Sequence, residues 1–544
     1  MTATTIQVDR PTPAPESSCA TLTPLGEEWA ELAPGQAARR YAEMIFRRAE
    51  QGMPLRKWQI DWADAPWPQK FYPGTQLVAL PRATAPGGLA SGGPVAMDRA
   101  LGDLLFYSYG VMGRRSRVNC NESTSMLVNA EEARWARGAS SGGGRYCAGV
   151  YLVVGRDFGL ESGIYHYSPI HHALERLSSG DWTGPVAHAQ RYPAAQQCYV
   201  ILTVKYWQSA FKYNDFACQA TSMDLGTLTG TWRYVLGEAA DLVQPDLWVD
   251  EASLAGILDL DSGAEAVCAV MGIGPATTAA VSPRPGGRLP HADERSQTVH
   301  SFVTQRALQR DALAERGVPS GLDPVWPVPE SLTASLTPDP AVKGRISDVW
   351  RRETSFGRFD GAPVRVEVLI ECLAEADAAQ SVVDRTFSGA TGREVGLYVI
   401  AEAVDGLPRG CYRFDAGTRA LRRAHTRDAM AILLRRYFLN NYDLERAAAL
   451  VVMTANPIGL GEAYGVRGYR AINTAAGAVC QHLHLACARR GVGAGTALGF
   501  DAASEFDALG LSGRDAIPVL TMFIGHDRLA SGALDLSLEC GGER

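Results

Sequence analysis

The feature that most constrains this sequence is an internal repeat. Residues 151–174 match residues 398–421 at a constant offset of 247, and from Lys212 onward the match continues at an offset of 251. In this second register Gly226 corresponds to Gly477, and Asp250 corresponds to Asp501. A period near 250 residues indicates two copies of one domain, because solenoid repeats are only about 20–50 residues long. We therefore expect a pair of similar domains.

Length and composition agree with a duplication. At 544 residues the chain is too long for one ordinary hydrophobic core. Its 46% hydrophobic and 20% charged residues are typical of a soluble globular protein. We expect a disordered N-terminal segment, an N-terminal domain, a Pro-rich linker with one helix, and a C-terminal domain. These parts are expected over residues 1–24, 25–281, 282–340 and 341–544, respectively.

Charge and cysteine usage argue against several classes of partner. The net charge of -7 argues against nucleic acid, because phosphate binding normally requires a basic surplus. Eleven scattered cysteines without a C-x-x-C pair predict neither a disulfide framework nor a metal site, and favour a reducing cytoplasm. No apolar run reaches the length of a membrane span, and residues 1–18 do not resemble a secretory signal. We expect a cytoplasmic protein that binds neither nucleic acid nor membrane.

Hydrophobic periodicity predicts both helices and strands. Helices are expected over 24–52, 97–109, 301–316 and 364–374, and another contains Lys212 to Gly226. Strands are expected over 150–154, 163–167, 197–206 and 267–273, with a last one ending at Ile524-Gly525. The polar segment from Arg114 to Glu132 is expected to be a surface loop.

The two copies differ in a stretch that carries reactive side chains. The first copy has Lys212 and Tyr213, and the second copy has Arg467 and Arg470. The residues at the corresponding positions of the other copy are Ala463, Tyr464, Phe216 and Gln219. A lysine beside a tyrosine favours the phenolate, which can then act as a base. The alternative is a lysine that extends to solvent beside a packed tyrosine.

Two further differences concern elements that bind anions. The second copy has a glycine loop that begins Gly491-Val492-Gly493, and its N–H groups are suited to cradling a ligand. Before its predicted helix it also has Arg351, Arg352, Ser355 and Arg358, donors that suit a phosphate. The alternative for this cluster is a solvated basic patch. Neither element matches a P-loop or a dinucleotide-binding fingerprint.

Aromatic residues are concentrated in residues 58–72, which contain Trp58, Trp62, Trp67, Phe71 and Tyr72. This segment is either a loop held over the core by its rings or one wall of a groove that binds a peptide or a ring.

Together these motifs resemble those of the flavin-dependent azoline dehydrogenases, the SagB/McbC-type oxidases of the nitroreductase-like superfamily. The resemblance covers about residues 80–528 apart from the linker, and the tandem arrangement is most similar to the dehydrogenases of thiopeptide biosynthesis. The motifs that carry it are Ser140-Ser141-Gly142-Gly143-x-x-Tyr146-Cys147, Gly163-x-Tyr165-x-Tyr167, Lys212-Tyr213-x-Asp215, Arg351-Arg352-x-x-Ser355 and Gly491-Val492-Gly493.

The resemblance implies an α+β fold in which two tandem nitroreductase-like, FMN-dependent domains form an intramolecular pseudo-dimer. It implies an oxidoreductase that converts thiazolines of a ribosomally synthesised precursor peptide into thiazoles during antibiotic biosynthesis, with oxazolines as a second possible ring. A proton would leave one ring carbon, a hydride would pass to flavin N5, and the electrons would go on to O2. A cyclodehydratase is the implied protein partner.

The resemblance also implies the site residues. Lys212 and Tyr213 match the family's catalytic pair, with Tyr213 as base or proton relay and Lys212 as its electrostatic partner. One FMN per chain is expected between the two halves, because the symmetry-related site lacks the arginines and the glycine loop. The implied FMN ligands are Ser140, Ser141, Gly142, Arg351, Arg352, Ser355, Gly491 and Gly493, with Arg467 or Arg470 as additions.

Some positions depart from the family pattern. The usual Pro-Ser turn is Ser140-Ser141, the following Pro and Glu positions are Cys147 and Gly149, and Ser355 lies two residues late. Two other functions stay open, a nitroreductase-like NAD(P)H oxidoreductase of small molecules and a flavin-free pseudoenzyme that binds a peptide. The Lys-Tyr pair favours the dehydrogenase over the first, and the Arg and Gly elements favour it over the second.

Overall fold

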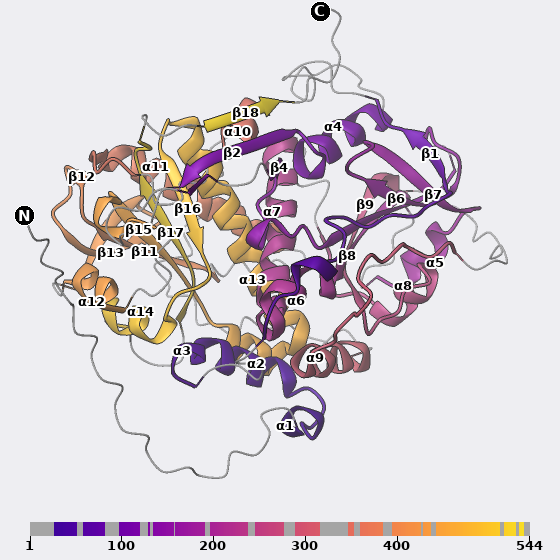
Figure 1. The fold of residues 1–544 in the computed structure, drawn as a ribbon, viewed down its shortest axis with the longest axis horizontal. Coiled ribbons are helices and arrows are strands. Elements are labelled where there is room, and N and C mark those ends of the chain that lie inside the picture. Colours follow the sequence, from indigo (N-terminus) through magenta and orange to yellow (C-terminus); the bar gives the residue numbers. More distant parts are fainter. Residues whose placement is uncertain are drawn as a thin grey trace, which may run out of the picture.

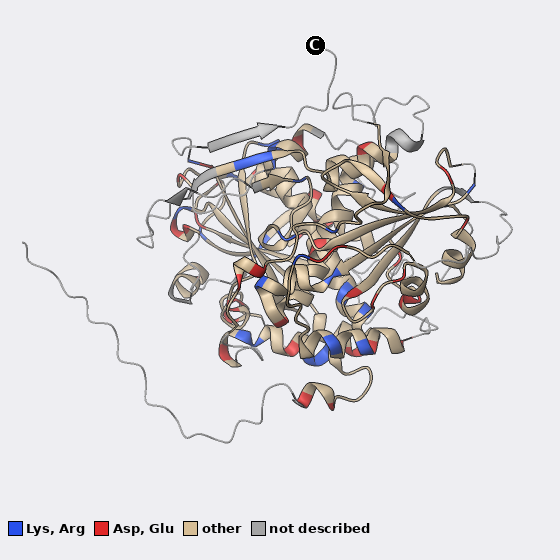
Figure 2. Ribbon diagram, turned by 45° about the vertical axis from the view of Figure 1, so that its right-hand side comes forward, with Lys and Arg blue, Asp and Glu red and all other residues tan. Residues whose placement is uncertain are grey.

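The protein is built from two similar halves, seen here in a computed structural model (Figure 1). The structure describes residues 27–51, 58–81, 97–119, 129–130, 134–156, 158–190, 196–237, 245–276, 289–315, 346–352, 359–383, 394–425, 428–436, 442–511, 516–528 and 533–537. The predicted disorder of residues 1–24 lies outside these ranges. Within them, no helix is both long and apolar enough to span a membrane. Basic and acidic residues are interspersed over both halves (Figure 2).

The first half contains a six-stranded antiparallel sheet in the order β1-β7-β6-β5-β8-β9. Alternate residues of its central strands face two different apolar clusters, so the sheet is covered on both sides. The strands are β1 (Gln76–Ala79), β5 (Ala148–Val154), β6 (Gly163–Ser168), β7 (Ala173–Ser179), β8 (Gln196–Lys205) and β9 (Glu265–Ala276). The four strands predicted in this half are thus confirmed.

The second half repeats this sheet in the order β14-β13-β11-β15-β17-β16. Its strands are β11 (Gly396–Ala401), β13 (Gly410–Asp415), β14 (Ala420–His425), β15 (Ala449–Ala455), β16 (Gly493–Ala497) and β17 (Ile517–Gly525). Among the described residues of the first half, which leave out 238–244, an isolated bridge, Asp246–Val270, stands at the place of β16. That bridge lies 251 residues before the Ala497–Thr521 pair of β16 and β17. The predicted offset of 251 residues therefore applies to both residues of the bridge.

Helices pack on and between these sheets (Figure 1). Those of the first half and the linker are α1 (Glu27–Ala30), α2 (Ala37–Phe46), α3 (Arg48–Gln51), α4 (Met97–Tyr109), α5 (Thr183–His188), α6 (Tyr206–Tyr213), α7 (Ala217–Leu236), α8 (Glu251–Ile257) and α9 (Val303–Ala314). Those of the second half are α10 (Ile346–Arg351), α11 (Val366–Ala378), α12 (Ala429–Arg436), α13 (Pro457–Arg489) and α14 (Ala502–Ala508). The 3₁₀ turns are η1 (Trp62–Asp64), η4 (Gly142–Gly144), η5 (Asn214–Phe216), η8 (Ala379–Val383) and η9 (Leu444–Arg446).

The long helices α7 and α13 cross at the centre of the molecule, and their contacts are reciprocal. A Cβ placed on Gly226 would lie 2.0 Å from the carbonyl oxygen of Thr474, and one on Gly477 would lie 2.1 Å from that of Met223. Because Thr474 and Gly477 are 251 residues after Met223 and Gly226, each contact is the image of the other. The two copies are therefore related by a pseudo-two-fold axis through this crossing, as in a dimer built within one chain.

The backbone repeats even where the sequences differ. Asn214 has φ 44° and ψ -132°, and its counterpart Gly465 has φ 59° and ψ -147°. In the first copy this left-handed residue separates α6 from α7, and in the second it kinks α13. The helix caps repeat as well: the Asp250 side chain accepts from the N–H of Ser253, and the Asp501 side chain accepts from that of Ser504.

Three sequence predictions about the fold are wrong. The single helix expected to contain Lys212 to Gly226 is interrupted, because Asn214 has a positive φ of 44° and η5 separates α6 from α7. The expected helix over 24–52 is broken at Gly35, with φ 83°, and again at Arg47, so three shorter helices form. The expected surface loop after Arg114 begins as strand β2 (Gly113–Asn119), which joins β3 (Asn129–Ala130), β4 (Arg134–Ala136) and β18 (Ala533–Ser537). Since β18 comes from the far end of the chain, local composition could not indicate this pairing. The short strands β10 (Val364–Arg365) and β12 (Val404–Asp405) form a separate parallel pair.

Candidate active site between the two halves

A glycine-rich turn of the first half forms the floor of the candidate site. It comprises η4 with its flanking residues Ser140, Ser141 and Tyr146. Asp224 on α7 holds this turn by accepting hydrogen bonds from the Ser141 hydroxyl at 2.5 Å and the Gly142 N–H at 2.8 Å. Burial raises the pKa of Asp224 to about 6, although these two donors act in the opposite direction. The turn is thereby fixed to the central helix.

Lys212 and Tyr213 lie directly over this turn, at the C-terminal end of α6. A Cβ placed on Gly143 would be 2.3 Å from the Tyr213 hydroxyl oxygen and 2.7 Å from the Lys212 Nζ. The Lys212 ammonium is 5.2 Å from the centre of the Tyr213 ring. Gly143 has φ 57° as well, a conformation that favours glycine. The structure thus brings the predicted catalytic pair onto the predicted Ser-Ser-Gly turn.

Arg352 of the second half grips the same turn from the other side. Its guanidinium donates to the carbonyl oxygens of Arg137 at 3.0 Å and Gly138 at 3.1 Å, and to the Ser140 hydroxyl at 3.0 Å. Burial lowers the pKa of Arg352, and the nearby Arg115 lowers it further. Every acceptor that these contacts give Arg352 is electrically neutral.

Helix α13 and strand β16 complete the second half's contribution. Gln481 accepts from the N–H of Ser140 at 3.1 Å and from its hydroxyl at 2.7 Å. One helical turn away, His484 Nε2 is 2.7 Å from the Thr496 hydroxyl on β16. Burial and the charge of Arg352 lower the pKa of His484 to about 3, which places this ring near the arginine and keeps it neutral.

The predicted glycine loop is mostly a strand. Gly491, with φ 69°, follows the end of α13, but Gly493 begins β16 and pairs with Gly525. Glycine is a weak strand former, so pairing with the buried strand β17 overrides the local preference. Gly491 and Gly493 therefore lie at the start of the strand that carries Thr496 toward α13.

The remaining predicted FMN ligands do not all lie at the candidate site. Arg351 is exposed at the end of α10, and Ser355 lies outside the described residues, as does Arg358. Arg467 and Arg470 are buried in α13 and form ion pairs with Glu251 and Glu315 of the first half and linker. Eleven residues of helix, about 16 Å of rise, separate Arg470 from Gln481. The structure therefore does not bring this pair to the Arg352 side of the helix.

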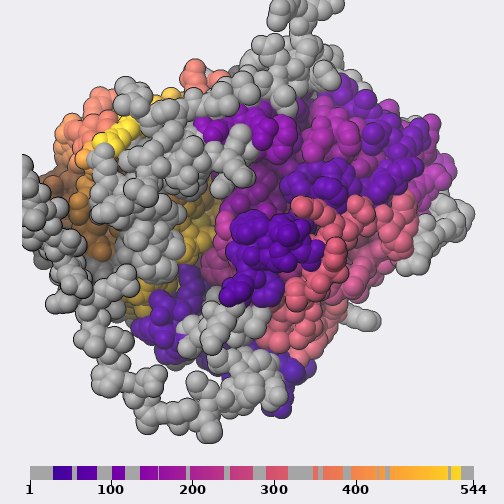
Figure 3. Space-filling view, in the orientation of Figure 1, coloured from indigo at the N-terminus to yellow at the C-terminus, as the bar shows by residue number. Residues whose placement is uncertain are grey.

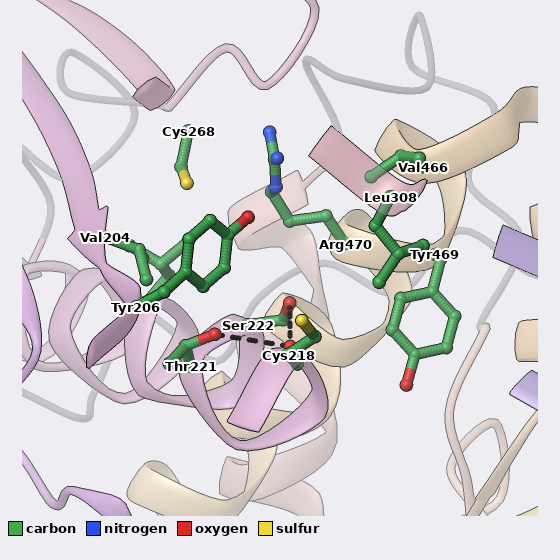
Figure 4. A pocket seen from close by; sticks show the side chains of 11 residues that line it. Val204, Tyr206, Cys218, Thr221, Ser222, Cys268, Leu308, Val466, Tyr469 and Arg470 are labelled. Atoms are coloured by element: carbon green, nitrogen blue, oxygen red, sulfur yellow. Dashed lines mark hydrogen bonds between the residues drawn. The ribbon is translucent and has the colours of Figure 1, made fainter. Parts of the chain in front are cut away.

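Charged and aromatic side chains of the chain surround Tyr464, the counterpart of Tyr213. Glu315, at the end of α9, accepts from the N–H of Val466 at 3.3 Å. Arg467 lies over the ring of Trp248, 5.6 Å from its centre, and that ring packs edge-on against Tyr464. Figure 4 shows Arg470 entering a small hollow nearby, between Cys268 and Val466. The expectation of one FMN per chain is not tested by these ion pairs and stays a prediction.

The aromatic segment, residues 58–72, lies on the first half next to residues 289–302 (Figure 3). The Trp58 indole N–H donates to the carbonyl of Phe211, the residue before Lys212, at 3.0 Å. Trp62 packs edge-on against the Phe211 ring at 5.3 Å, yet 58% of its surface is exposed. Trp58 thus packs on the protein as the first alternative expects, and the groove that the second alternative expects stays a prediction.

Several residues of the site carry no sequence signal of their own. Asp224 and Gln481 each sit in the middle of a long apolar helix, where a polar residue is easily taken for a buried structural group. Arg137 precedes the Ser-Ser-Gly turn and is 3% exposed. The internal repeat could have drawn attention to Gln481, because its counterpart in the first copy is Gly230.

The comparisons with known proteins identify the fold as nitroreductase-like. Residues 350–526 match the model of the nitroreductase family. A protein from Anabaena variabilis ATCC 29413, described as a nitroreductase, superposes over 90% of this chain and 99% of its own with a TM-score of 0.67 at 21% identity. These findings confirm the predicted fold class, two tandem nitroreductase-like α+β domains that form an intramolecular pseudo-dimer.

Other solved structures match single portions of the chain. The E. coli microcin synthetase McbBCD complex with truncated pro-MccB17 bound matches 32% of this chain and 68% of its own, with 15% identity and a TM-score of 0.27. A nitroreductase-type protein from Desulfovibrio desulfuricans in complex with FMN matches 34% of this chain and 85% of its own, with 16% identity and a TM-score of 0.23. No curated protein matches the chain.

Proposed function

We propose that this protein is an FMN-dependent dehydrogenase that oxidises thiazolines of a ribosomally synthesised peptide to thiazoles. The observation that carries the proposal is the meeting of Lys212 and Tyr213 with a turn that Arg352 of the other half holds. An oxidoreductase that only passes hydride to a small molecule needs no base at this point. Removing two hydrogens from a ring does need one, because one of them leaves as a proton.

The residues present fit a phosphate-bearing flavin. Arg352 is a partly buried cation whose acceptors are two carbonyls and a hydroxyl, and withdrawing a charge from water without a counter-charge is costly. Ser140 and Ser141 present hydroxyls from the first half, and Gly491 and Gly493 provide a backbone edge from the second. The residues expected to hold FMN are thus Arg352, Ser140, Ser141, Gly142, Gly491 and Gly493, with Ser355 as a further prediction.

The chain's own residues would work as follows. Lys212 stabilises the negative charge on the Tyr213 oxygen, and that oxygen takes the proton from a ring carbon of the azoline. FMN, when bound, supplies the acceptor for the second hydrogen with its electron pair. Asp224 keeps the turn, and with it the room above Gly143, in one geometry. Loss of the proton and the hydride from adjacent ring atoms leaves the aromatic azole.

Removal of Arg352 tests the cofactor part of the proposal. Arg352→Ala should release FMN, weakening its binding by roughly 10- to 100-fold, because a charge-assisted hydrogen bond contributes about 1.5–3 kcal/mol. The measurement is the flavin absorbance of the purified protein, followed by titration with FMN. Exposed Arg351→Ala is the matched control and should keep the cofactor. A colourless wild-type protein that cannot be loaded with FMN would overturn the proposal.

Trp62 tests whether the substrate is a peptide. An exposed indole beside the catalytic pair can stack on planar rings of a bound chain, a contact worth about 0.5–1.5 kcal/mol. Trp62→Ala should therefore raise KM several-fold for a multi-ring peptide, with little effect on a minimal single-thiazoline substrate. Leu77→Ala removes a comparably exposed side chain of the following strand β1, since Leu77 is 49% exposed and Trp62 is 58% exposed. It should change the KM of neither substrate. Rapid reduction by NADPH without turnover of any thiazoline would favour a small-molecule reductase instead.

A further inference from the structure

Arg137 is a buried cation that the residues around it leave incompletely satisfied. Its side chain is 3% exposed, and in the described part of the chain its Nε and Nη1 have no hydrogen-bond partner. The guanidinium lies over the rings of Tyr146, at 4.3 Å from the ring centre, and Tyr109, at 5.0 Å. Such stacking uses the faces of the guanidinium and leaves its in-plane N–H donors without acceptors.

The surroundings of Arg137 are poor in negative charge and rich in arginine. Its own carbonyl is one of the groups that Arg352 grips. Arg115 on β2 donates to the backbone carbonyl of Arg352 at 2.9 Å. Burial lowers the pKa of Arg352 while Tyr146, over whose ring the Arg137 guanidinium lies, raises it, so Arg137 and Arg352 both lie near this ring. Asp224 is turned toward Ser141 and Gly142, and burial raises its pKa. An anion that accepts in-plane hydrogen bonds would satisfy these donors and offset the cost of burying the charge.

We propose that Arg137 is a ligand for the phosphate group of the flavin, supplied by the first half to complete the grip of Arg352 from the second. This inference rests on the proposed function for the presence of FMN, and it adds a ligand that the sequence motifs did not indicate. The phosphate would be held by one arginine from each half, so a separated half would hold it weakly. Tyr146, whose φ of 48° is unusual for a residue with a side chain, keeps the Arg137 guanidinium in place from below.

A comparison of two flavins tests this assignment. FMN and riboflavin differ only in the phosphate, so a phosphate ligand must affect one and spare the other. The affinity of the full-length apoprotein for each is measured by quenching of flavin fluorescence. Arg137→Gln should weaken FMN binding roughly 10- to 100-fold and change riboflavin binding by less than about threefold. Arg137→Lys keeps the charge but loses the paired N–H donors of the guanidinium. Its FMN affinity should lie between those of the wild type and Arg137→Gln.

The controls separate this inference from the proposed function. Arg114→Gln removes an exposed arginine of β2 whose guanidinium carbon is 5.3 Å from the centre of the Trp135 ring. This variant should leave the ratio of FMN to riboflavin affinity unchanged. Equal losses for FMN and riboflavin in Arg137→Gln would make Arg137 structural, and unchanged FMN affinity would exclude it as a ligand. If Arg137→Gln does not fold, the ratio of FMN to riboflavin affinity in Arg137→Lys distinguishes a phosphate ligand from a structural residue in the same way. A wild-type protein that binds neither flavin would instead overturn the proposed function itself.

Discussion

Tyr213→Phe is expected to reduce azole formation by roughly 10²- to 10⁴-fold while leaving the bound flavin in place, since a positioned general base contributes about that much. The substitution removes one oxygen atom, the one that lies above Gly143, and keeps the ring that packs against Phe216 at 6.2 Å. The fold and the cofactor grip should therefore survive. The rate is measured by the mass loss of about two hydrogens per ring from a thiazoline peptide.

Lys212 provides the companion variant. Lys212→Ala should also slow azole formation, and its effect should be larger at lower pH, where the phenolate most needs the neighbouring ammonium. Tyr464→Phe is the matched control, because it makes the same change at the pseudo-symmetric position, where Glu315 and Arg467 gather instead. If Tyr213→Phe loses flavin together with activity, the pair is structural. If it turns over normally, another group is the base.

The organisation of the fold could be predicted from the sequence because the repeat carries long-range information. The match of Gly226 with Gly477 predicted corresponding positions, and the structure places these two glycines at one crossing. Strands β5, β6, β8, β9 and β17 could be predicted because apolar and aromatic residues dominate them. Strand β2 could not be predicted, because its partner β18 lies at the other end of the chain and the polar sequence of β2 does not indicate that pairing.

The candidate site was only partly predictable, for a similar reason. Lys212, Tyr213 and the Ser-Ser-Gly turn belong to short motifs, but the contacts that hold them connect residues far apart in sequence. Asp224 lies 83 residues from Ser141, and Arg352 lies 212 residues from Ser140. Arg467 and Arg470 show the opposite limitation. Their residue types suited an anion, but Glu251 and Glu315 are already paired with them inside the protein.

Gly477→Ala tests the pseudo-dimer itself, and it should be strongly destabilising. The added Cβ would lie 2.1 Å from the Met223 carbonyl oxygen and 2.8 Å from its carbon, so the two backbones of α7 and α13 must separate. Overpacking of this kind costs about 1–3 kcal/mol and occasionally more, and rigid backbone atoms can yield less than side chains do. The thermal unfolding midpoint should fall, and flavin should be lost with it, because the site is built across this crossing.

Gly256→Ala is the matched control, since it makes the same change in a helix where the added Cβ meets nothing within 4 Å. There alanine should stabilise the helix by up to about 1 kcal/mol, so the two variants should shift the midpoint in opposite directions. The reciprocal variant Gly226→Ala should behave as Gly477→Ala does, because its Cβ would lie 2.0 Å from the Thr474 carbonyl oxygen. A midpoint raised by Gly477→Ala would mean that the two helices do not approach at this glycine, and the shared site would then need a different scaffold.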